Sequence, residues 1–335
     1  MTGRDPNAVH RLLGMLVALA VVGCSLSPGS AAPGIASPGT SGSPQATQAP
    51  VGTLSAEATG SQVNATVVWQ VDEGISQPLG LALAKDGTTY VVDFRDGVIN
   101  RIAPNGKLLV PWGSPGSGNG RLAAAAGIAI DAKGSIYVAD HDNYRIEKFS
   151  ADGTFVATWG SRGDAPGSFD GPDGIAVDAR GQVWVTEDAN SRIQVFDADG
   201  GLRQVITATA DLKFGDPTGI AFANDAVYVA DFEANKIWVL STAGVLKSTI
   251  GSAGTADREF DGLSFMATDA DGSLFVTDYG NGRVQQFAPD GTFVKAILFG
   301  PGKPFSRPYG VAVGPDGDLY VSEFGASRVE RMHTH

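Results

Sequence analysis

The chain has 335 residues, of which 43% are hydrophobic and 18% charged, and it contains 45 glycines. Such a composition is sufficient for a large core and indicates many turns. The formal net charge is −12 at pH 7, whereas phosphate binding depends on a cationic surface. Nucleic acid is therefore excluded as an expected partner.

An export signal is predicted at the start of the chain. Residues 1–23 contain two arginines, an apolar run over residues 12–22 and a small residue before Cys24. The apolar run is too short to span a bilayer as a permanent helix. The tetrapeptide VVGC, which ends at Cys24, resembles the lipobox of bacterial lipoproteins, whose cysteine is acylated. This resemblance implies an extracytoplasmic protein anchored to the bacterial membrane by lipid, the alternative being an ordinary signal with an incidental cysteine.

A flexible tether is predicted after the signal. Residues 24–64 consist largely of Ser, Pro, Gly, Thr and Ala, with Glu57 as their single charge. Such a segment cannot bury enough apolar surface to offset the entropy lost on ordering. We therefore expect three parts, namely a signal over residues 1–23, a tether over residues 24–64 and a folded domain over residues 65–335. Because Cys24 is the sole cysteine, an intrachain disulfide is excluded.

The folded domain is built from six related segments. Each contains two short stretches with the two-residue alternation of a strand, and the second stretch ends in an acid. Dipeptides such as Asp152-Gly153 supply the positive φ that tight hairpins require. The period of about 45 residues is that of a four-stranded propeller blade. The segments begin at Gly80, Gly127, Gly174, Gly219, Phe265 and Gly310.

These repeats resemble a known family. The phrases GIAVD, YVAD, NYRI and DGTFVATWGS are similar to those of NHL-repeat proteins, and the likeness extends from Ala65 to the C-terminus. The resemblance implies an all-β, six-bladed β-propeller. It does not imply one activity, because the family includes binding modules, scaffolds, receptor ectodomains and lyases.

The two ends of the domain complement each other. The sixth repeat stops after its third strand, at residues 328–332, whereas residues 65–72 have a strand pattern ahead of the first repeat. Pairing these segments would close the ring and remove open sheet edges. We therefore expect an N-terminal strand to complete the last blade.

Five repeats carry a base five residues after the acid that ends the second strand. We interpret these pairs as structural ion pairs that join the second strand to the third, with a charged ring for an anionic ligand as the alternative. The resemblance agrees, since the arginine of the NHL motif is structural. In the first repeat Val98 replaces the base. The predicted pairs are Asp140 with Arg145, Glu187 with Arg192, Asp231 with Lys236, Asp278 with Arg283, and Glu323 with Arg328.

The loops that follow the second strands are expected to surround one mouth of the central channel. Aromatic side chains recur directly after the strand-ending acid, and they would suit a sugar face, an aromatic group or a peptide side chain. The alternative is that these rings pack between blades. Asp173 and Tyr309, which lie just before the first strand of their repeats, are further candidates for ligand binding. The residues after the acids are Phe94, His141, Asp188, Phe232, Tyr279 and Phe324.

No complete catalytic set is found. Amidating lyases with this fold hold zinc with several histidines, but His141 is the one histidine within a blade loop. No cofactor is therefore predicted, although an enzyme of this class would need a divalent cation. We expect a binding protein for a protein, peptide or glycan on the loop-rich face. The alternative is a metal-dependent lyase or lactonase-type enzyme at the channel mouth.

Overall fold

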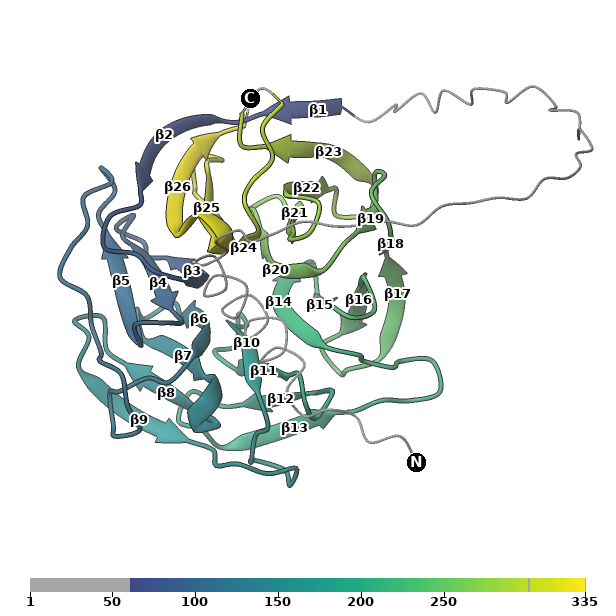
Figure 1. The fold of residues 1–335 in the computed structure, drawn as a ribbon. Helices are drawn as coiled ribbons and strands as arrows, with labels where there is room; N and C mark the ends of the chain where they lie inside the picture. Colours follow the sequence, from purple (N-terminus) through teal and green to yellow (C-terminus); the bar gives the residue numbers. More distant parts are fainter. Residues whose placement is uncertain (1–60, 301, 335) are drawn as a thin grey trace, which may run out of the picture. The chain divides into compact units, whose positions relative to one another are not determined.

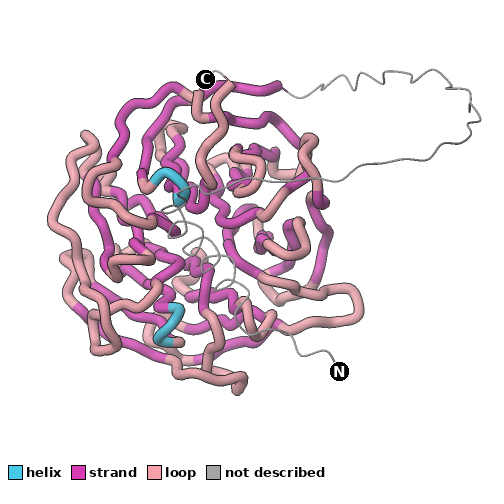
Figure 2. Tube along the Cα trace, in the orientation of Figure 1, coloured by secondary structure: helices cyan, strands magenta, loops and turns pink. Residues whose placement is uncertain are grey.

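The structure is a computed structural model that describes residues 61–300 and 302–334. In these residues the fold is almost entirely β, with two short 3-10 turns, η1 (His141–Asn143) and η2 (Phe324–Ala326) (Figure 2). None of the described helical segments is long and apolar enough to cross a membrane. The predicted signal, the lipidation site Cys24 and nearly all of the expected tether lie outside the described residues.

Six sheets surround a central axis, as the sequence predicted (Figure 1). Each is an antiparallel meander whose first strand lies at the axis and whose last strand lies at the rim. Blade 1 comprises β3 (Pro78–Leu83), β4 (Thr89–Asp93) and β5 (Val98–Ile102). Blade 2 comprises β6 (Ala125–Ile130), β7 (Ile136–Asp140), β8 (Arg145–Phe149) and β9 (Phe155–Trp159). Blade 3 comprises β10 (Pro172–Val177), β11 (Val183–Glu187), β12 (Arg192–Phe196) and β13 (Leu202–Ile206).

The remaining three blades follow the same order. Blade 4 comprises β14 (Pro217–Ala223), β15 (Ala226–Asp231), β16 (Lys236–Ser241) and β17 (Leu246–Ile250). Blade 5 comprises β20 (Leu263–Thr268), β21 (Leu274–Asp278), β22 (Arg283–Phe287) and β23 (Phe293–Leu298). Blade 6 comprises β24 (Pro308–Val313), β25 (Leu319–Glu323) and β26 (Arg328–His333). Between blades 4 and 5, β18 (Ser252–Ala253) and β19 (Glu259–Phe260) form a small parallel pair.

The ring closes through the N-terminal segment, which confirms the predicted closure. Strand β2 (Thr66–Val71) pairs antiparallel with β26 and supplies the fourth strand of blade 6. The residues just before Ala65 also form a strand, because β1 (Ser61–Asn64) pairs in parallel with β23 and adds a fifth strand to blade 5. Blade 1 differs from the predicted four strands. Its outer segment contributes only the bridges Ile99 to Trp112 and Ile102 to Leu108.

Glycines at the axis allow the blades to approach one another. A Cβ at Gly174 would lie 2.0 Å from the carbonyl oxygen of Thr218 in the next blade, and one at Gly127 would lie 2.4 Å from that of Asp173. Both distances are far below van der Waals contact, so a side chain at either position would force the inner strands apart. The glycine of the repeat therefore sets the diameter of the channel.

The core lies between neighbouring sheets. Strands β7, β11 and β25 are buried along their whole length, because both faces of each blade are covered by a neighbour. Trp184 of blade 3 is 1% exposed and contacts Phe222 of blade 4 edge to face, with ring centroids 5.5 Å apart. Burial of each large apolar side chain of this kind stabilises the fold by about 1.5–3 kcal/mol.

Candidate ligand-binding site at the channel mouth

The acids that end the second strands form buried ion pairs. In four blades the carboxylate has no exposed surface, and the arginine predicted to face it lies at an N···O distance of 2.5 to 2.8 Å. Breaking such a pair would leave an uncompensated buried charge, so these residues are structural rather than free to bind an anion. The four pairs are Asp140 with Arg145, Glu187 with Arg192, Asp278 with Arg283, and Glu323 with Arg328.

The fifth predicted pair requires a correction. Within the described part of the chain no ion pair joins Asp231 to Lys236, although the two residues are opposite each other in the sheet. Asp231 instead accepts a hydrogen bond of 2.8 Å from the indole nitrogen of Trp238. The Lys236 ammonium lies over that ring, 5.1 Å from its centroid. The tryptophan replaces the base because its N–H reaches the same carboxylate from the third strand.

Each carboxylate also positions the loops at the mouth, a role that the sequence pattern alone did not reveal. Asp140 accepts hydrogen bonds of 2.7 Å from the backbone N–H of Ala123 and from the amide of Asn143. The same amide donates to the carbonyl of Gly116 in the preceding loop, at 2.9 Å. The sequence does carry this feature in three repeats, as an asparagine two residues before the arginine. The equivalent asparagines are Asn190 and Asn281.

These loops bring several aspartate side chains of blades 2 to 4 together at the mouth. His141, in η1, lies 2.9 Å from Asp142 and 3.5 Å from Asp188 of the neighbouring blade. Burial would lower the pKa of His141, but the ion pairs with Asp142 and Asp188 raise it to about 10. The side chain is therefore an imidazolium at neutral pH and does not act as a base. We name the carboxylates Asp142, Asp173, Asp188 and Asp216 the acidic side of the mouth.

Two members of the acidic side lack an ion-pair partner among the described cations. Asp173, at the start of β10, is fully buried, and neither of its carboxylate oxygens has a hydrogen-bond partner. Burial and the charge of Asp188 raise its pKa to about 7, against the opposing effect of His141. Asp216 is 6% exposed, and its Oδ1 also lacks a partner. Burial, followed by the charges of Asp188 and Asp173, raises the pKa of Asp216 well above its usual range.

Tyr309 is affected by the charges of these carboxylates from across the ring. It lies on the inner strand of blade 6, which is opposite blade 3 in the ring (Figure 1). Burial, followed by the charges of Asp173 and Asp216, raises the pKa of the Tyr309 hydroxyl well above its usual range. The inner strands that carry Asp173 and Tyr309 both line the axis of the ring.

The other half of the mouth is aromatic. Phe232 and Tyr279 meet edge to face with centroids 6.0 Å apart, and Tyr279 meets Tyr309 at 6.2 Å. Tyr309 in turn contacts Phe265 at 5.3 Å. We name these four rings the aromatic arc. Phe232 and Tyr279 are half-buried, whereas Tyr309 and Phe265 are buried.

The remaining candidates lie outside both groups. Phe94 of blade 1 is half-buried, and Phe324 is 7% exposed within η2, which favours a packing role for Phe324. Three members of the site were not predicted as binding residues. Asp142 follows the candidate His141 in the chain, so proximity could have suggested it, whereas Phe265 occupies the position at which the other five repeats have glycine. Asp216 lies in a loop that does not keep the repeat pattern, and only the ring geometry brings it to Asp173.

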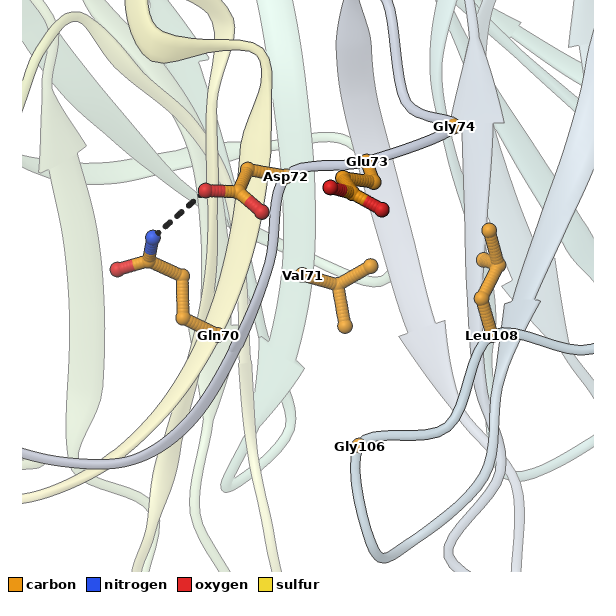
Figure 3. A pocket seen from close by; sticks show the side chains of 7 residues that line it. All are labelled: Gln70, Val71, Asp72, Glu73, Gly74, Gly106 and Leu108. Atoms are coloured by element: carbon orange, nitrogen blue, oxygen red, sulfur yellow. Dashed lines mark hydrogen bonds between the residues drawn. The ribbon is translucent and has the colours of Figure 1, made fainter.

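A shallow pocket lies where the end of β2 and the segment after it meet the outer segment of blade 1. It has a volume of about 470 Å³ and is lined by residues 70–74 together with Gly106 and Leu108 (Figure 3). The amide of Gln70 donates a hydrogen bond of 3.2 Å to Asp72 at its edge. No predicted site residue contributes to this pocket. Within residues 61–300 and 302–334, no group of three His, Cys, Asp or Glu side chains is arranged to hold a metal ion.

Comparison with known proteins agrees with this architecture. The sequence model described as NHL repeat matches residues 122–149 and 169–196. These two ranges contain the inner three strands of blade 2 and of blade 3. The chain is a six-bladed β-propeller in which blades 2 and 3 match the NHL repeat. No curated protein is similar in sequence to this propeller at a significant level.

Several solved structures share the propeller fold. A catalytically inactive variant of virginiamycin B lyase from Staphylococcus aureus, in complex with quinupristin, has a TM-score of 0.58 at 18% identity, over 80% of this chain and 86% of that chain. A streptogramin B lyase has a TM-score of 0.57 at 17% identity, over 80% and 98%. A protein of unknown function from Bacteroides thetaiotaomicron has a TM-score of 0.65 at 14% identity, over 83% and 74%. Identities this low establish the fold alone.

Proposed function

We propose that this NHL propeller is a lipid-anchored, extracytoplasmic protein that binds a protein, peptide or glycan at the channel mouth. The observation that supports the proposal most is the continuity of the acidic side with the aromatic arc. The backbone N–H of Phe232 donates a hydrogen bond of 2.9 Å to the carbonyl of Asp216, so the two halves meet at one loop. Concave sites with aromatic walls and a few convergent polar groups are typical of ligand recognition. The lipid anchor is proposed from the lipobox at Cys24.

The proposal is tested by the binding of the purified protein to arrays of peptides and of glycans. Phe232→Ala and Tyr279→Ala each remove a half-buried ring from the arc, and we expect each to weaken binding of any ligand found by about tenfold, the usual effect of losing an aromatic anchor. Val245→Ala, at a 63% exposed side chain on the rim of blade 4, is the matched control. Ligands whose binding is unchanged by both arc variants would contradict the proposed location.

An enzymatic function is the second candidate, and one observation favours it. A carboxyl group with a pKa near 7, such as Asp173, can exchange a proton at neutral pH beside an imidazolium. Incubation with quinupristin, the ligand of the related lyase, followed by chromatography separates the two candidates. The binding proposal predicts an unchanged elution profile. A new product that is lost in Asp173→Asn, together with about one tightly held divalent ion per chain, would favour the enzyme.

A further inference from the structure

We propose that Asp173 and Asp216 bind the ammonium or guanidinium group of a peptide ligand whose apolar part lies on the aromatic arc. This inference rests on the proposed binding function and specifies the chemistry of its ligand. It concerns the two carboxylates of the acidic side that lack an ion-pair partner, and not Asp142 and Asp188, which flank His141.

The isolation of Asp173 is the first argument. Buried polar groups in folded proteins are almost always hydrogen-bonded, and buried carboxylates are paired with a cation. Every strand-ending acid of the ring is hydrogen-bonded, and four of the six are also paired with an arginine, whereas both oxygens of Asp173 and the Oδ1 of Asp216 have no partner. Asp173 lies at the start of the inner strand of blade 3 and Asp216 directly precedes the inner strand of blade 4, and the charge of Asp173 contributes to the raised pKa of Asp216. A positive group that reaches both carboxylates would supply their missing partners.

The neighbourhood of the carboxylates indicates the kind of cation. Asp216 is hydrogen-bonded through its carbonyl to the backbone of Phe232, the first ring of the arc. A lysine or arginine side chain combines an apolar stem with a terminal cation, and either cation is also attracted to the face of an aromatic ring. A bare metal ion would instead require several oxygen ligands, and it would make no use of the rings. The combination of acid and arc therefore favours an organic cation.

The charge around Asp173 and Asp216 disfavours an anionic group beside them, whereas at the arc the Arg307 guanidinium lies 6.0 Å from the centroid of the Tyr279 ring. The His141 imidazolium opposes the rise in the pKa of Asp173, and it is engaged by Asp142 and Asp188. Arg192, on the same blade as Asp173, is engaged by Glu187 and by backbone carbonyls. An anionic peptide group at the mouth would therefore meet uncompensated carboxylates.

The test compares two matched peptides by isothermal titration of the purified full-length protein at pH 7.5. One is the acetylated dipeptide amide lysyl-phenylalanine, and the other is its neutral counterpart glutaminyl-phenylalanine. We expect the lysyl peptide to bind about tenfold more tightly to the wild type, the effect of one desolvated charge contact. Asp173→Asn and Asp216→Asn should each reduce this preference to about twofold or less. Asp271→Asn, at an exposed hairpin turn, should retain it.

The outcomes separate the inference from the function on which it rests. Equal binding of both peptides by the wild type, with loss in Phe232→Ala, would overturn the cation inference and leave the binding function in place. Binding of neither peptide would contradict both for peptide ligands. A third arm adds magnesium chloride, and stoichiometric binding of Mg²⁺ that excludes the lysyl peptide would overturn the assignment to an organic cation.

Discussion

Asp173 is the residue at which stability and the proposed role conflict most clearly. Its carboxyl group is removed from water without a hydrogen-bond partner, which destabilises the folded state whenever the group is ionised. Substitutions at functional residues often stabilise a protein, because such residues are placed for the ligand and not for the fold. The sequence showed only that Asp173 precedes an inner strand. Its isolation follows from the closure of the ring around it.

Asp173→Asn is therefore expected to stabilise the free protein in a pH-dependent way. The pKa of about 7 in the folded protein exceeds the ordinary value near 4, so the folded state binds more protons between these pH values, and its stability falls as pH rises from about 4 to about 7. Substitution by asparagine removes this pH-dependent loss of stability, because an amide does not ionise. In thermal unfolding, the melting temperature of the variant should match the wild type at pH 4 and exceed it by about 2–4 °C at pH 8. A variant that melts lower at pH 8 would contradict the assignment.

At the scale of the element, the third strands differ in how they satisfy the acid of the second strand. In blade 3 the amide of Gln194 donates to Glu187 at 2.8 Å, and its oxygen accepts from the backbone of Gly167 at 2.8 Å. In blade 2 the same position is Glu147, which is fully buried and lacks a partner for Oε2. Burial raises the pKa of Glu147 to about 7, and Asp140 adds to the rise while Arg145 opposes it.

Glu147→Gln should therefore reproduce the arrangement of blade 3. Its amide would donate to Asp140, and its oxygen would keep the hydrogen bond that the N–H of Gly120 makes to Oε1. We expect a rise in melting temperature of about 2–4 °C at pH 8, where the wild-type carboxyl is ionised, and little change near pH 4. The reverse change in blade 3, Gln194→Glu, should lower the melting temperature. If both substitutions shift it in the same direction, the comparison between blades fails.

At the scale of the whole molecule, the ring depends on a strand far from its partner in the chain. Deletion of residues 65–72 would remove β2 and expose the edge of β26. We expect a loss of about 10 °C or more in melting temperature, corresponding to roughly 3–5 kcal/mol. Deletion of residues 25–59, which leaves β1 and β2 intact, should have no such effect. An unchanged melting temperature without β2 would contradict closure by this strand.

The sequence was most informative where a local rule repeats. The glycine of turn dipeptides such as Asp152-Gly153 adopts the expected positive φ. The strand-ending acids face the expected arginines in four blades. It was least informative where one blade departs from the rule, as when Trp238 replaces the base, or where contacts cross between blades, as for Asp216. Parallel addition of β1 to blade 5 was also missed, because four polar-rich residues carry no strand signal of their own.

The central claim is that the channel mouth is the binding surface, and photo-crosslinking tests it most directly. The aromatic crosslinker benzoylphenylalanine replaces Tyr279 at the mouth or Val245 on the rim of blade 4 in the full-length protein, and the two forms are irradiated in the cell envelope. We predict a discrete adduct at position 279, absent at position 245 and reduced by Asp173→Asn. An adduct confined to position 245 would contradict the central claim, whereas one at position 279 that Asp173→Asn does not change would contradict only the role of Asp173.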